Sequence, residues 1–202
     1  MPGGPSTRVA IIDNGGANIA SLRYALERLG VESRLTAAPD ELNSASHVIL
    51  PGVGAAGDAM RRLERSGFAD AIQQLERPLL GICLGMQLLY ESSAEGDTRC
   101  LGLIPGRLEK LASSPDHPVP HMGWNRIRAL SDSPLLDGIG ADDYFYFVHS
   151  YAAPVNDATL ASADYGRTFA SVVAHGRFYG TQFHPERSAR VGQRVLANFL
   201  EL

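Results

Sequence analysis

The chain has 202 residues, of which 45% are hydrophobic and 20% are charged, so it can bury one sizeable core. Its formal net charge is -4 and its basic residues are spread along the sequence, which argues against a nucleic-acid partner. No apolar run approaches the length of a membrane span, and the first seven residues lack the apolar core of a signal peptide. We therefore expect a loose tail over residues 1–7 and one domain over residues 8–202.

The first half of the chain alternates between short apolar runs and amphipathic stretches. A β-branched run at 8–13 precedes a helical pattern at 19–29, and a second strand is expected at 31–35. The next strand, 47–50, enters the glycine-flanked turn Pro51-Gly-Val-Gly54, and another helical pattern follows. This β-α-β order predicts a mostly parallel sheet with helices on its faces.

The most informative stretch is Gly81-Ile-Cys-Leu-Gly85. An apolar run precedes it and helix-forming residues follow it, so the pattern predicts a strand, a tight turn and a helix. Gly-x-Cys-x-Gly is the thiol counterpart of the Gly-x-Ser-x-Gly nucleophile elbow, in which glycines allow a sharp turn that pushes the central side chain out. At a helix N-terminus, the thiol of Cys83 should ionise more readily than a free cysteine. Taken alone, the motif fits a nucleophile and a buried structural cysteine equally well.

A second motif, His184-Pro-Glu186, favours the nucleophile. In an extended segment the two outer side chains project to the same side, and the proline restricts the backbone between them. A cysteine hydrolase needs a base for the thiol proton and a carboxylate that orients this base. The two motifs together predict a triad of Cys83, His184 and Glu186.

After Tyr90 the sequence changes to shorter strand-like runs, separated by turns rich in Pro, Gly and Asp. Hairpins are therefore expected to replace crossovers, which predicts an antiparallel extension beside the parallel core. The last segment, 188–202, is amphipathic and has Ser188 as a candidate N-cap, so we expect a final helix. The expected strands cover residues 101–104, 107–111, 124–129, 144–149, 159–163, 168–174 and 177–183.

Gly81-Ile-Cys-Leu-Gly-Met-Gln87 and Gln182-Phe-His-Pro-Glu186 resemble the class I (triad) glutamine amidotransferase family. Three further stretches, 51–55, 121–125 and 145–151, resemble the amidotransferase subunits of imidazole glycerol phosphate synthase, a histidine-biosynthesis enzyme. The likeness extends over nearly the whole chain from Arg8. It implies the α/β fold of class I glutamine amidotransferases and a glutaminase that releases ammonia and glutamate from glutamine.

The resemblance implies roles for the matching positions. Cys83 would attack the side-chain amide of glutamine, His184 would act as base and then as acid, and Glu186 would orient His184. The oxyanion would be stabilised by the Gly52-Val53 peptide, after a flip of that peptide, and by the amide of Leu84. The remaining substrate-binding candidates are Gln87, His149, Ser150 and Tyr151.

A partner is also implied, because free ammonia is mostly protonated in neutral water and must travel along a shielded path to its acceptor. In this family the acceptor nucleotide is bound by a separate (β/α)8-barrel cyclase subunit, which makes imidazole glycerol phosphate and aminoimidazole carboxamide ribonucleotide within a heterodimer. Arg187 stands where we expect lysine, which keeps the charge and alters its geometry. Interface candidates are Asn18, Trp124, Asn125, Tyr146 and Arg187, and Tyr146 fits a plain strand aromatic nearly as well.

Other functions remain open at this point. The chain could serve a different synthase, such as one for pyridoxal phosphate or anthranilate, or it could be a catalytically silent regulatory module or a stand-alone cysteine hydrolase. An intact set of triad residues argues against the silent module. With only Cys83 and Cys100, the chain has neither a disulfide framework nor a cysteine metal cluster, so we expect a cytoplasmic protein without a metal or other cofactor.

Overall fold

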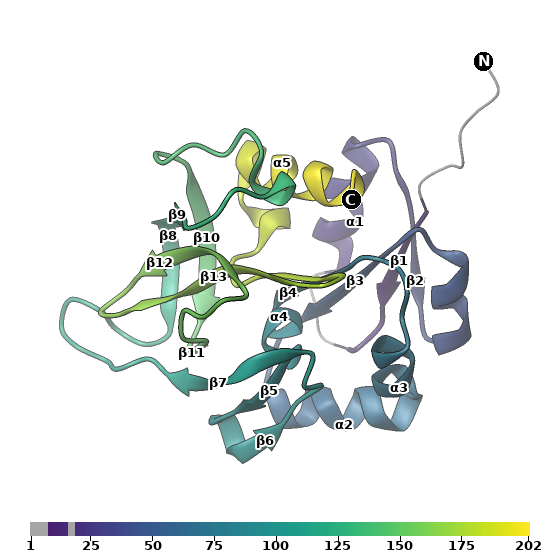
Figure 1. Ribbon diagram of the computed structural model, residues 1–202, viewed down its shortest axis with the longest axis horizontal. Coiled ribbons are helices and arrows are strands. Elements are labelled where there is room, and N and C mark those ends of the chain that lie inside the picture. The colour runs from purple at the N-terminus through teal and green to yellow at the C-terminus, as the bar shows by residue number, and fades with distance from the viewer. Residues whose placement is uncertain (1–7, 16–18) are drawn as a thin grey trace.

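The computed structural model describes residues 8–15 and 19–202, and over these residues it contains a central eight-stranded sheet (Figure 1). The first five strands in sheet order pair in parallel and the last three pair antiparallel. The predicted parallel core with an antiparallel extension is thereby confirmed. In sheet order the strands are β2 (Glu32–Thr36), β1 (Arg8–Ile12), β3 (His47–Gly52), β4 (Leu79–Cys83), β14 (Phe178–Thr181), β13 (Thr168–His175), β12 (Thr159–Asp164) and β9 (Arg128–Ala129).

Helices cover both faces of this sheet. Alternate residues of β1 enter different hydrophobic clusters, because successive side chains of a strand point to opposite faces. One cluster includes apolar residues of α2 (Ala56–Ser66) and α3 (Phe68–Gln73), and the other includes those of α1 (Ile19–Arg28) and α5 (Ala189–Leu200). Figure 1 shows these two helix pairs on opposite sides of the sheet. Burial on both faces explains why the central strands read as continuous apolar runs.

Two smaller sheets within the described residues stand beside the main one. A two-stranded sheet pairs β8 (His121–Arg126) with β10 (Tyr144–His149). A four-stranded sheet has the order β11 (Tyr151–Ala152), β7 (Ile104–Lys110), β5 (Tyr90–Ser93) and β6 (Thr98–Arg99). The remaining elements are the helix α4 (Leu84–Leu88) and the 3-10 turns η1 (Pro39–Ser44), η2 (Glu95–Asp97), η3 (Pro134–Leu136) and η4 (Pro185–Arg187).

Two strand predictions were wrong. Residues 101–103 form no strand, because the amides of Leu101 and Leu103 donate to the carbonyls of Leu88 and Leu89 at the end of α4. The predicted strand 124–129 is broken at Ile127, whose side chain is buried in the core while β8 and β9 join different sheets. The short strands β5 and β6 were not predicted.

Ser188 occupies the predicted N-cap position of α5, but its side chain makes no capping hydrogen bond. Its hydroxyl donates to the carbonyl of His184 and accepts from the amide of Tyr146. It therefore joins the His184 turn to β10 instead of capping the helix. Over the ranges 8–15 and 19–202, no helix is long and apolar enough to cross a membrane. The predicted tail, residues 1–7, and the interface candidate Asn18 lie outside the described residues.

Candidate active site

Cys83 is the last residue of β4 and lies directly before α4, as the elbow motif predicts. Its backbone has φ 54° and ψ -111°, a conformation that side-chain-bearing residues rarely adopt. A Cβ atom on Gly85 would lie 1.8 Å from the carbonyl oxygen of Leu50. Glycine at position 85 therefore lets α4 pack directly against β3, and this close packing holds Cys83 in its strained turn. The Cys83 residue is only 7% exposed and forms part of a cavity wall instead of projecting into solvent.

His184 and Glu186 form a buried pair. The Nδ1 atom of His184 lies 2.8 Å from Oε1 of Glu186. The predicted reason for this contact was wrong, because Pro185–Arg187 is a 3-10 turn and not extended chain. The turn folds the carboxylate back onto the ring, and the His184 amide donates to the carbonyl of Tyr146. Both functional groups are thereby fixed relative to β10.

The charge on His184 depends on its two neighbours in the triad. Burial lowers the pKa of His184, but the nearby Cys83 sulfur and the hydrogen-bonded Glu186 carboxylate outweigh this effect and raise the pKa to about 10. Among the described residues, Nε2 of His184 makes no hydrogen bond, so Cys83 acts on the ring as a neighbour and not as a bonded partner. The thiol and this ring line the same cavity, and contacts in a catalytic site often tighten only when substrate binds. The arrangement favours an imidazolium, the form that stabilises a neighbouring thiolate.

A cavity of about 300 Å³ is lined by Cys83 and His184 of the triad, and it is in the size range of small-molecule sites. It includes every predicted oxyanion and substrate-binding residue except Gly52, which lies in a smaller pocket behind Val53, beside His184 and Glu186. Three of the lining residues were not predicted from the sequence, since none of them belongs to a nucleophile or base motif: Glu95, Pro120 and Val148. The lining residues are Val53, Gly54, Cys83, Leu84, Gln87, Glu95, Pro120, Val148, His149, Ser150, Tyr151 and His184.

Gly52 is packed too tightly to serve as a probe of the Pro51–Gly54 turn. Gly52 is the buried last residue of β3, and a Cβ atom there would lie 2.7 Å from the amide nitrogen of Gly85. A substitution of Gly52 would therefore disturb packing rather than report on a peptide flip. Gly54 has φ +91°, and nothing lies within 4 Å of an added Cβ atom, so it is the cleaner position at which to test the turn.

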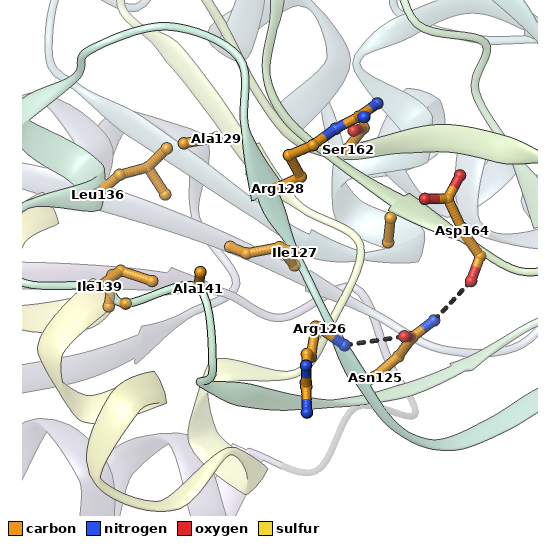
Figure 2. A pocket seen from close by; sticks show the side chains of 12 residues that line it. Asn125, Arg126, Ile127, Arg128, Ala129, Leu136, Ile139, Ala141, Ser162 and Asp164 are labelled. Carbon is orange, nitrogen blue, oxygen red and sulfur yellow. Dashed lines mark hydrogen bonds between the residues drawn. The ribbon is translucent and has the colours of Figure 1, made fainter.

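A larger cavity, of about 500 Å³, lies elsewhere, between β8, β9, β12 and η3 (Figure 2). Its walls contain neither cysteine nor histidine, so it offers no nucleophile and base pair of the triad kind. Asn125 lies in its wall. The Asn125 amide donates to the Asp164 carbonyl over 2.9 Å and accepts from the Arg126 amide over 2.8 Å, as Figure 2 shows.

Three of the predicted interface residues lie together. Trp124 is 54% exposed and makes an edge contact with Tyr146, with 5.9 Å between ring centroids. The guanidinium carbon of Arg187 lies 4.2 Å from the centroid of the Tyr146 ring. We call Trp124, Tyr146 and Arg187 the aromatic patch. Asn125 is separate from it, because its side chain is bonded to Asp164 in the wall of the larger cavity.

Residues 10–202 match the family described as Glutamine amidotransferase class-I. The chain belongs to the class I glutamine amidotransferase family. This amidotransferase is 54% identical over 196 residues to the protein named imidazole glycerol phosphate synthase subunit HisH from Xylella fastidiosa, covering 97% of this chain and 98% of the relative. The protein of the same name from Xanthomonas axonopodis pv. citri is 53% identical, with the same coverage.

Solved structures support the fold of this amidotransferase. A crystal structure described as glutamine amidotransferase has a TM-score of 0.74 at 19% identity, covering 96% of this chain and 97% of that one. PurLQS from Thermotoga maritima has a TM-score of 0.72 at 20% identity, covering 98% and 99%. At such low identity these likenesses show the shared fold alone.

Proposed function

We propose that this amidotransferase is the glutaminase subunit of an imidazole glycerol phosphate synthase and that it supplies ammonia for histidine biosynthesis. The observation that carries the proposal is the convergence of Cys83 and His184 on one cavity, with Glu186 hydrogen-bonded to the His184 ring, in a chain whose relatives at 53–54% identity bear the name of that subunit. His184 and Glu186 lie far from Cys83 in the sequence, so the arrangement depends on the fold.

The proposed reaction has two steps. The thiolate of Cys83 attacks the amide carbon of glutamine, and the C–N bond breaks while His184 gives its proton to the leaving nitrogen, which departs as ammonia. A thioester remains on the sulfur. Water then attacks the thioester while His184 accepts a proton from it, and glutamate leaves with its carboxylate formed and the sulfur released. Glu186 holds the ring through Nδ1, so that Nε2 faces the reacting atoms.

Backbone amides are proposed to stabilise the oxyanion of each tetrahedral intermediate. Val53 and Leu84 both line the cavity beside Cys83, one from the Pro51–Gly54 turn and the other from the start of α4. Donors of this kind act where negative charge develops, and each one lowers the barrier by about 3 kcal/mol. The Val53 amide is proposed to become available when the Pro51–Gly54 turn changes conformation.

The ammonia acceptor is proposed to lie on a separate (β/α)8-barrel cyclase subunit, docked over the aromatic patch. This patch adjoins the triad, because Arg187 follows Glu186 in η4 and the Tyr146 carbonyl accepts from the His184 amide. Exposed aromatic residues and arginine are the side chains most often found at the centre of protein interfaces. A partner seated there would contact the segments that carry His184 and Glu186, and it is proposed to receive the ammonia without its release into water.

Triad variants test the proposal. Cys83→Ala should reduce glutaminase activity to background, and His184→Ala should cost nearly as much, because nucleophile and base act as one unit. Glu186→Gln should cost less than either, though still about 100-fold or more, because the ring keeps its place and loses its charged orienting group. Turnover is measured with the purified cyclase subunit and acceptor nucleotide present.

Two controls accompany these variants. Cys100→Ala removes the other buried free thiol, which is outside the cavity, and should keep its glutaminase activity. All triad variants should still support synthesis when ammonium salts replace glutamine, because the cyclase is untouched. Normal glutamine turnover in Cys83→Ala would show that another residue is the nucleophile.

A further inference from the structure

Gln182 is a fully buried residue between β14 and the triad, and its side-chain amide reaches the sulfur of Cys83. Its Nε2 atom donates to Sγ over 3.8 Å, and its Oε1 atom accepts from Nε2 of Gln87 over 2.9 Å. The Cys83 thiol in turn donates to the carbonyl of Val148 over 3.6 Å. That second contact requires the thiol proton, whereas the bond from Gln182 strengthens when the sulfur is ionised.

The orientation of the Gln182 amide is set by its neighbours. Nε2 of Gln87 lies 2.9 Å from the Tyr151 carbonyl, which can only accept, so the nitrogen of Gln87 must face it. The second hydrogen of that nitrogen is directed at Gln182, which places Oε1 of Gln182 on this side. Nε2 of Gln182 is thereby turned toward Cys83.

The chain of hydrogen bonds continues through two histidines. The Tyr151 carbonyl also accepts from Nδ1 of His149 over 2.9 Å, which leaves Nε2 of that neutral ring as an acceptor. Nδ1 of His121 lies 3.0 Å from this acceptor and must therefore carry the proton. Burial lowers the pKa of His121 to about 4 and that of His149 to about 3, so both rings are neutral near pH 7.

Asn125 fixes the far end of this chain. Its Nδ2 atom lies 3.5 Å from Nε2 of His121 and also donates to the Asp164 carbonyl, while its Oδ1 atom accepts from the Arg126 amide (Figure 2). Two backbone groups thus decide which way the Asn125 amide points. The Tyr151 carbonyl accepts from both His149 and Gln87, and on the Gln87 side the pattern ends with an N–H group of Gln182 directed at sulfur.

We propose that Gln182 is a further catalytic residue, which stabilises the thiolate of Cys83 through this hydrogen bond, and that Gln87, held by the Tyr151 carbonyl, is the positioning residue that keeps the Gln182 amide turned toward the sulfur. The inference rests on the nucleophilic role of Cys83 proposed above. It gives Gln87 a task besides lining the substrate cavity.

The experiment measures the reactivity of Cys83 directly. Iodoacetamide alkylation of the two cysteines is followed by peptide mass spectrometry between pH 5 and pH 9, in the wild type and in Gln182→Met, which removes the donor at similar volume. The other groups around the sulfur remain in place, namely His184 with Glu186 behind it and Glu95 and His149 in the cavity wall. Alkylation of Cys83 at pH 7 should slow about tenfold and its pH profile should move toward higher pH, because a hydrogen bond to a charged group is lost.

Gln87→Met tests the positioning role of Gln87. It removes the donor that holds Oε1 of Gln182, so the amide can turn and the pH profile should move in the same direction by a smaller amount. Gln73→Met, on the exposed face of α3, is the matched control and should give the wild-type profile. A Gln182→Met protein that melts like the wild type and alkylates with the wild-type pH profile would overturn the proposal.

A second measurement covers the case in which Gln182→Met does not fold. In ¹⁵N-labelled wild-type protein, the side-chain amide protons of Gln182 should shift when Cys83 is replaced by alanine, because one of them loses its bond to sulfur. An unchanged Gln182 amide signal would overturn the inference. Neither readout depends on turnover, so a wrong assignment of the nucleophile would appear separately, as normal glutaminase activity in Cys83→Ala.

Discussion

The buried histidines His121 and His149 make the stability of this amidotransferase sensitive to acid. Burial lowers the pKa of both rings below the ordinary value for histidine, to about 4 and about 3. Both rings are almost fully buried, and the His121 ring stacks on that of Tyr165 with 3.9 Å between centroids. In the unfolded chain both rings would take up protons near the ordinary pKa of about 6.5.

We therefore predict that the protein loses stability as the pH falls from about 6.5 toward 4. The contribution of these two rings is complete well above pH 6.5, where both are neutral in the folded and unfolded states, and it declines below this value because only the unfolded state binds the protons. At pH 5 the loss should be on the order of 2 kcal/mol for each histidine. Urea unfolding at pH 7, 6 and 5 measures it.

His121→Gln provides the matched test, because it removes one of the two titrating rings. Its free energy of unfolding should depend less steeply on pH below 6.5 than that of the wild type. The exposed His175→Gln change should leave the wild-type dependence in place. Equal acid sensitivity in all three proteins would contradict the buried neutral pair.

At the scale of elements, the site depends on how closely α4 approaches β3 and β4. Glycines make this approach possible: a Cβ atom on Gly81 would lie 2.6 Å from the amide nitrogen of Met86, and one on Gly85 would overlap the carbonyl of Leu50. The elbow glycines therefore serve packing between elements as well as the turn itself. A helix of only five residues is held in place by these contacts rather than by its own hydrogen bonds.

We predict that Gly85→Ala destabilises the protein by about 3 kcal/mol or more, because the new methyl group has no space beside the backbone of β3. Gly140→Ala is the control, since its added Cβ atom would be in ordinary contact, 3.6 Å from Asp143, and its φ is not positive. It should change the free energy of unfolding by less than about 0.5 kcal/mol. Chemical denaturation compares them, and a Gly85→Ala protein of wild-type stability would show that α4 can move away from β3.

At the scale of the whole molecule, the triad and the aromatic patch lie on the same end of the fold. The elbow sits at the carboxyl end of β4, where ligands bind in open α/β sheets. The β8–β10 pair stands beside this edge and brings Trp124 next to Tyr146 and Arg187. A partner on the patch would therefore contact both η4 and β10, the two segments that position His184.

We predict that Trp124→Ala weakens binding of the cyclase subunit by about 10- to 100-fold, as expected for a central aromatic residue of an interface. Alkylation of Cys83 in the isolated subunit should stay unchanged, because Trp124 does not line the triad cavity. Leu35→Ala, an exposed residue on the edge strand β2 at the far end of the sheet, is the control and should bind normally. Calorimetric titration gives both affinities, and equal binding by Trp124→Ala would place the interface elsewhere.

The sequence by itself determined the features that depend on neighbouring residues. Apolar runs and helical periodicity predicted the parallel core, and Gly-x-Cys-x-Gly predicted the strand, turn and helix around Cys83, because turn geometry depends on the residues at the turn. The family motifs named the triad positions, and all but one of the oxyanion and substrate-binding residues that they named line the cavity. These inferences needed no knowledge of contacts between distant segments.

Only the tertiary structure decided the features that depend on contacts between distant segments. Residues 101–103 close the end of α4 instead of forming a strand, and Ser188 links two backbone segments instead of capping a helix. Gln182 and Cys83 are 99 positions apart, and His121 and His149 are 28 apart, so no local pattern relates them. Hydrogen-bond partners of buried polar groups are chosen by packing, because each group must find a partner among whichever residues the fold places beside it.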